Sequence, residues 1–133
     1  MDNPRILHQS TGDQDKVQRL GPYVLETLIA EADEIQMTAY RVTIEPGSTT
    51  AISHHRKAEE IYYVLAGQGI ALLDGVEHRL HAGDFLRLPP GVKHGFVTQE
   101  EALVMLDIHS PGSRPNRDVF FEGEPPSGFS PNE

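Results

Sequence analysis

The chain has 133 residues, a length that suits one domain with a hydrophobic core of its own. Its net charge of −9 disfavours a nucleic-acid partner, and the absence of cysteine excludes disulfides, thiolate metal sites and cysteine nucleophiles. The N-terminal residues show no leader and no apolar run is long enough to span a membrane, so we expect a cytoplasmic protein that binds small molecules.

Short runs of alternating or β-branched residues follow one another along the chain. Residues 1–22 lack periodicity and predict an N-terminal arm, whereas 23–112 predict a barrel that begins with the run YVLETLI. Further strands are expected from Met37 to Ile44 and at 49–55, 60–65, 85–88, 94–98 and 102–109, with a hairpin at Asp74-Gly75. Residues 113–133 are rich in Pro, Gly, Ser and Asn and predict a partly flexible C-terminal arm, in which only 118–122 look able to pack. Many short strands without a helical period predict an all-β sandwich or barrel.

A polar cluster precedes the strongest predicted strand. His54, His55 and Glu60 lie just before or at the start of the run EIYYVL, and His94 follows a rigid corner formed by Pro89-Pro90-Gly91. Imidazole nitrogen and carboxylate oxygen together bind divalent first-row metals. The pattern therefore predicts a metal site carried on a small β scaffold.

These residues resemble the two sequence motifs of the cupin family of jelly-roll barrels, also called double-stranded β-helices. The matching positions, in the family's order, are Gly47, His55, Glu60 and Gly67 in the first motif and Gly83, Pro89, Gly91 and His94 in the second. Thr98 stands where the second motif has Asn. The resemblance spans 40–111 and implies a cupin-type barrel with one divalent ion, iron, manganese, nickel or zinc, and a homodimer.

The chain departs from the first motif at one position that matters for the metal. Ser53 occupies the place of the first histidine of the family's pair, and His54 stands next to it. In a regular strand Ser53 and His55 share the metal face and His54 points away. A bulge would instead bring His54 to the metal and give three histidines and one glutamate, a set that we favour slightly.

Other residues are candidates for the walls of a substrate pocket. Every second residue of a strand lies on the same face, so residues that follow Glu60 and His94 at this spacing should also point inward. These residues are Tyr62, Phe96 and Thr98, and Tyr40 is a further candidate. His109 ends the last long strand, and a place at the cavity rim is the less favoured alternative for it. His78 and His81 are expected at the surface.

Family resemblance implies a wide range of chemistry, because similar cupins include dioxygenases, decarboxylases, isomerases, epimerases and lyases. Our first interpretation is a metal-dependent, dioxygenase-like or related enzyme acting on a small organic substrate. The alternatives are a non-catalytic binding or sensor module and a barrel whose metal is purely structural.

Overall fold

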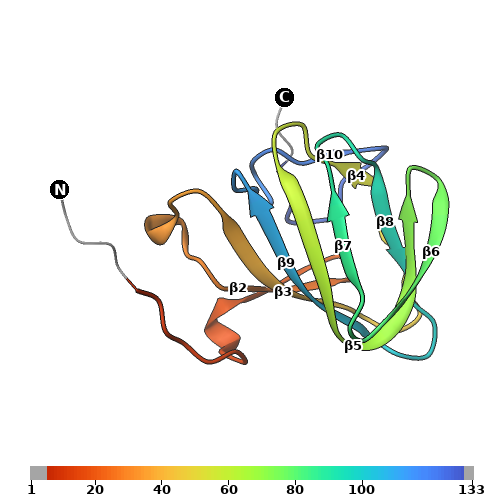
Figure 1. Ribbon diagram of the computed structural model, residues 1–133, viewed down its shortest axis with the longest axis horizontal. Coiled ribbons are helices and arrows are strands. Elements are labelled where there is room, and N and C mark those ends of the chain that lie inside the picture. Colours follow the sequence, from red (N-terminus) through yellow and green to blue (C-terminus); the bar gives the residue numbers. More distant parts are fainter. Residues whose placement is uncertain (1–5, 131–133) are drawn as a thin grey trace.

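The computed structural model describes residues 6–130, which form a curled antiparallel barrel with two short 3₁₀ turns (Figure 1). Residues 1–5 of the expected N-terminal arm and 131–133 of the expected C-terminal arm lie outside the described residues. The elements are η1 (Gln14–Lys16), β1 (Val17–Leu20), β2 (Tyr23–Thr27), η2 (Glu31–Asp33), β3 (Thr38–Ile44), β4 (Ser53–His54), β5 (Glu59–Leu73), β6 (Val76–His81), β7 (Phe85–Leu88), β8 (His94–Val97), β9 (Leu103–Ser110) and β10 (Phe120–Phe121). The all-β architecture predicted from the sequence is thereby confirmed.

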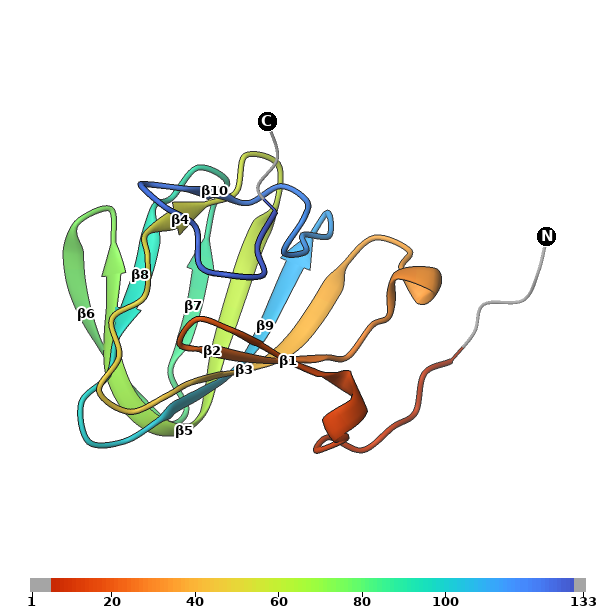
Figure 2. The same ribbon diagram turned by 180° about the vertical axis from the view of Figure 1, so that it is seen from behind.

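The long strand β5 joins the two halves of the barrel. Along the main path the strands lie in the order β1-β2-β3-β9-β5-β8-β4-β10, and β6 and β7 also pair with β5. The first part of β5 pairs with β7 and β9, and its last part pairs with β6 and β8. Both views show this strand curving from one half of the barrel into the other (Figures 1 and 2).

Alternating side chains fill the space between the two halves. In β5, Tyr62 and Val64 are buried while Tyr63 and Leu65 are exposed, as the sequence pattern predicts. The interior is filled by a cluster of apolar residues from eight strands, among them Leu25, Val42, Ile44, Val64, Phe96, Leu103 and Met105.

Both expected arms contain ordered structure, of which the sequence pattern indicated only the packing of 118–122. Strand β1 falls within 1–22 and pairs with β2 along its whole length. Residues 113–130, here called the roof segment, fold over one end of the barrel, where β10 pairs with β4 and the ring of Phe129 contacts Tyr23 and Phe121 edge-on (Figure 2). No helix in the described range 6–130 has the length and apolar character needed to cross a membrane.

Candidate metal centre

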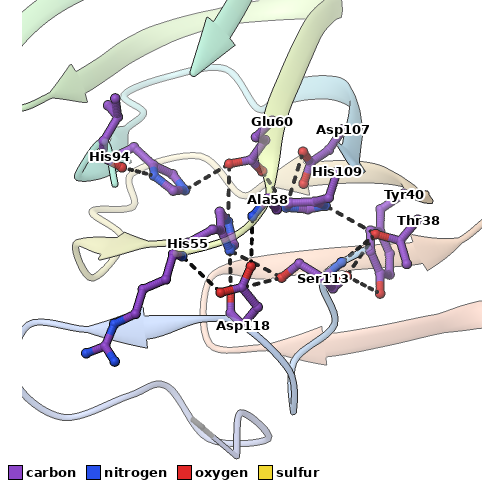
Figure 3. Close-up of polar contacts among 12 residues, drawn as sticks. Thr38, Tyr40, His55, Ala58, Glu60, His94, Asp107, His109, Ser113 and Asp118 are labelled. Carbon is purple, nitrogen blue, oxygen red and sulfur yellow. Dashed lines mark hydrogen bonds and ion pairs between the residues drawn. The ribbon is translucent and has the colours of Figure 1, made fainter. Parts of the chain in front are cut away.

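Three strands and one turn bring four titratable side chains together. Glu60, near the start of β5, is directly opposite His109 on β9, so their side chains emerge on the same face. His94 begins β8, and His55 follows β4 immediately (Figure 3). All four are buried, with exposed fractions of 1% for Glu60 and 7% or less for the histidines.

Glu60 lies at the centre of this cluster. Its Oε1 atom is 3.2 Å from Nε2 of His55 and 3.2 Å from Nε2 of His94, and its Oε2 atom is 2.8 Å from Nε2 of His109. Three imidazole nitrogens therefore contact the two oxygens of a single carboxylate.

The opposite ring nitrogens determine which imidazole atoms carry hydrogen. His55 Nδ1 lies 2.6 Å from the carbonyl oxygen of Asp118, and His94 Nδ1 lies 3.0 Å from that of Val92. A carbonyl oxygen cannot donate, so each Nδ1 is the donor and, in the neutral ring, Nε2 carries a lone pair. Thr38 has the same effect on His109, because its hydroxyl donates to the carbonyl oxygen of Ser113 and leaves His109 Nδ1 to donate to Thr38 at 3.4 Å.

With neutral rings, lone pairs of three nitrogens would thus face lone pairs of a carboxylate. Neither Glu60 oxygen has a hydrogen bond of acceptable geometry among the described residues, although both are fully buried. Such an arrangement is unfavourable unless a cation or additional protons lie among the groups. Ligand atoms of His55, Glu60 and His109 lie within 4.8 Å of one another, and His94 adjoins them through Glu60. Imidazole and carboxylate donors with oriented Nδ1–H groups fit a divalent first-row metal ion.

The electrostatics of the protein without metal show how strongly these groups interact. Burial alone would raise the pKa of Glu60, but the positive charges of His109 and His94 hold it well below its usual value. Burial also lowers the pKa of His94, whereas for His55 the close contact with the negatively charged Glu60 outweighs burial and raises the pKa. The pKa of Asp107 is raised well above its usual value by burial and then by the charge of Glu60.

A small cavity of about 60 Å³ lies against this cluster. Its walls include Tyr23, Tyr40, Ser53, Tyr62, Asp107 and, from the roof segment, Ser113, Arg114, Val119, Phe121 and Phe129. This volume accommodates a few water molecules or a compact ligand, whereas pockets for larger organic ligands are typically several hundred Å³.

The structure does not bring His54 to the cluster. Ser53 is buried, pairs with His94 and lines the cavity, while the His54 ring stacks on Phe120 at a centroid separation of 5.5 Å. Strand β4 is thus regular, which corresponds to the first of the two alternatives left open by the sequence, and no bulge turns His54 inward.

His109 belongs to the cluster although sequence analysis gave it only a minor place. Strand β9 buries every second residue, from Leu103 through Met105 and Asp107 to His109. A buried aspartate and histidine in this alternating series are the signal that could have identified them. Of the expected pocket residues, Tyr62 and Tyr40 line the cavity, whereas two others lie elsewhere: Phe96 packs in the core against Tyr62, and Thr98 bonds to the backbone of Ser48 and Glu45.

The fold and these motifs define a cupin. The chain belongs to the family described as Cupin domain, whose model matches residues 40–109. Pectin degradation protein KdgF of Dickeya dadantii is 27% identical over 99 residues, which cover 74% of this chain and 88% of that protein. Acireductone dioxygenase of Bacillus pumilus is 32% identical over 57 residues, covering 39% of this chain and 32% of the enzyme.

Similarity to solved structures supports the same fold. Streptomyces Pac13 with uridine, a protein described as a nucleoside dehydratase, superposes with a TM-score of 0.73 at 18% identity, covering 88% of this chain and 92% of that one. Several curated relatives are matched over about half of their length or less. The relatives include an enzyme, acireductone dioxygenase, and a protein of pectin degradation, so cupin enzyme chemistry is compatible with this chain.

Proposed function

We propose that this protein is a metal-dependent cupin enzyme that acts on a small organic substrate. His55, Glu60, His94 and His109 would hold one divalent ion, which is iron, manganese, nickel or zinc. The observation that carries the proposal is the convergence of three Nε2 lone pairs on the buried carboxylate of Glu60. An ion bound there supplies Lewis acidity or lowers the pKa of bound water.

The residues around the cluster support a functional site in a cavity. Tyr40, Tyr62 and Asp107 contribute polar groups to the walls, and the aromatic residues of the roof segment limit access of water. Enzymes among the relatives, including the dioxygenase and the lyase DddW of Ruegeria pomeroyi, are consistent with a catalytic role.

A second candidate is a non-catalytic module that holds the metal for binding, sensing or stability. The small cavity volume of about 60 Å³ and the presence of a fourth protein donor, His109, favour it, because both reduce the room for a substrate beside the ion.

Replacing His94 by alanine tests the metal site, and removing the metal from the wild type with a chelator tests whether the metal is structural. For an open functional site we expect a loss of metal affinity of roughly tenfold or more, while the wild-type protein stays folded when a chelator removes its metal. Metal analysis and melting curves with and without chelator measure both effects. Unfolding of the wild type on chelation would instead show a structural metal. Turnover and oxygen consumption on a panel of small organic substrates then distinguish an enzyme from a binding module.

Metal affinity should fall as the solution becomes more acidic. Protons compete with the metal for Nε2, so release is expected as pH drops through about 6 to 7 or below, where free histidine becomes protonated. Because its pKa is raised, His55 should protonate before His94, whose pKa is lowered by burial. Competition with a chelator at a series of pH values measures the effect. An affinity that stays constant down to about pH 4 would contradict histidine ligation.

The proposal includes two further points, namely that the protein forms a homodimer and that it is located in the cytoplasm. Exposed apolar side chains on β5 and β7, at Tyr63, Leu65 and Phe85, offer a surface on which a second copy could pack.

A further inference from the structure

The cavity beside the metal centre contains a guanidinium group. Among the described residues that line it, Arg114 is the only lysine or arginine, whereas Glu60 and Asp107 contribute carboxyl groups. The Arg114 side chain is nearly buried, with 9% of its surface exposed. A buried cation requires partners, so the contacts of Arg114 indicate what it can still bind.

Arg114 shares its one carboxylate partner with a second arginine. Arg114 Nε and Nη2 each lie 2.9 Å from Oε1 of Glu34, and Arg117 Nη2 lies 2.5 Å from the same oxygen. Two guanidinium groups on one carboxylate leave one positive charge in excess. In a chain with a net charge of −9, this excess at a cavity wall is a local exception that favours an anion.

Arg114 lines the cavity and keeps donors that its contacts with Glu34 do not use. Nη2 also donates to the carbonyl oxygen of Ile29 at 3.0 Å, and the guanidinium has two further N–H groups on Nη1. Arg114 is close enough to the Tyr40 hydroxyl to counter in part the rise that burial causes in the pKa of Tyr40. Tyr40 in turn lies edge-on to His109, with 6.3 Å between ring centroids (Figure 3).

We propose that Arg114 binds the carboxylate of an anionic substrate whose other end reaches the metal centre. The Tyr40 hydroxyl assists by turning to the substrate from the carbonyl oxygen of Ser113, to which it donates a long hydrogen bond of 3.4 Å. The substrate class is then a short organic acid, since the cavity of about 60 Å³ excludes larger molecules unless the roof segment moves. A planar guanidinium suits this task because it matches the two oxygens of a carboxylate. The inference deepens the proposed function and rests on it for the position of the ion.

The test compares an anion with its neutral counterpart of the same shape. Glycolate and glycolamide are titrated into cobalt-loaded and metal-free protein, with calorimetry for affinity and the visible spectrum of cobalt as a report on the ion. The wild type is expected to prefer glycolate by roughly tenfold or more, as a hydrogen-bonded charge pair implies. Arg114→Gln should lose this preference, and Arg114→Lys should restore part of it.

Arg117→Gln is the matched control, because Arg117 bonds to the same Glu34 oxygen but does not line the cavity. It should keep the preference for glycolate. The inference is overturned if the wild type shows no preference, if Arg114→Gln retains it, or if Arg117→Gln loses as much, since the last result would mean that both arginines merely hold Glu34. Should Arg114→Gln fail to fold, Arg114→Lys and Tyr40→Phe provide the comparison.

The experiment gives different results if the proposed enzyme function is wrong and if the inference about Arg114 is wrong. If cobalt does not bind, or binds without any substrate being turned over, the enzyme proposal fails. The difference between glycolate and glycolamide is then read from calorimetry on the same protein, and its presence or absence decides whether Arg114 binds a carboxylate, while the contact of that ligand with an ion falls together with the enzyme proposal.

Discussion

Replacing Glu60 by glutamine is expected to weaken metal binding by at least about 100-fold, a larger loss than for groups that only support a ligand. Glu60 is the group that all three imidazole Nε2 atoms contact, and the substitution removes its charge while keeping its shape. Metal affinity is measured by competition with a chelator of known strength.

Stability of the metal-free protein should respond differently to the same substitution. The glutamine amide keeps the shape of the carboxylate but lacks the negative charge that the nearby histidines favour in the folded protein, so we expect a melting temperature that is unchanged or lowered. Glu59→Gln is the matched control, because Glu59 is the neighbouring residue on β5 but is exposed and pairs with Arg87 at 2.8 Å. Retention of wild-type metal affinity by Glu60→Gln would refute the proposed centre.

Replacing Asp118 by alanine should reduce both stability and metal affinity. The Asp118 carboxylate accepts hydrogen bonds from the backbone N–H groups of Arg56, Lys57 and Ala58, at 2.9, 3.1 and 2.9 Å, and its carbonyl oxygen accepts one from His55 (Figure 3). Leaving those backbone groups without a partner should lower the free energy of unfolding by about 2–4 kcal/mol. Loss of the restraint on His55 should weaken metal binding roughly 10- to 100-fold.

Asp74 provides a control for the backbone conformation of Asp118. Both residues have a positive φ, 48° for Asp74 and 56° for Asp118, and Asp74 accepts a backbone hydrogen bond from Lys93 in an exposed hairpin turn. Asp74→Ala should therefore cost little stability and leave metal affinity unchanged. Denaturant titrations and metal competition measure the two effects. Equal metal affinity in Asp118→Ala and the wild type would contradict a positioning role for Asp118.

Much of the barrel could be predicted from the sequence, because a strand with one buried face imposes a period of two on its residues. The alternation around Tyr62 and the hairpin at Asp74-Gly75 both appear in the structure. Strand β1 was not predicted, since only Leu20 of its four residues is buried and its pairing with β2 is the main reason for its conformation. Of the roof segment, the sequence predicted only that 118–122 can pack, and not its position over the barrel, because long-range contacts such as those of Asp118 determine that position.

The candidate site was predictable in part for a similar reason. The motif spacing placed Glu60 and His94 near one another, and the structure brings them into contact. His109 depends on the register between β9 and β5, which the composition of either strand alone does not specify. Whether His54 or Ser53 faces inward depends on a bulge, and the sequence of β4 leaves both registers possible.

The acceptors that orient His55 and His94 are main-chain carbonyl oxygens, of Asp118 and Val92. Any amino acid at position 92 carries such an oxygen, so evolution can exchange that side chain without removing the acceptor, provided that the chain keeps its path. Asp118 differs, because its carboxylate also holds the backbone of 56–58 and its φ is positive. An alignment of homologues would then show a variable column at 92, although this position orients a metal ligand, and backbone geometry would be the better guide to its role.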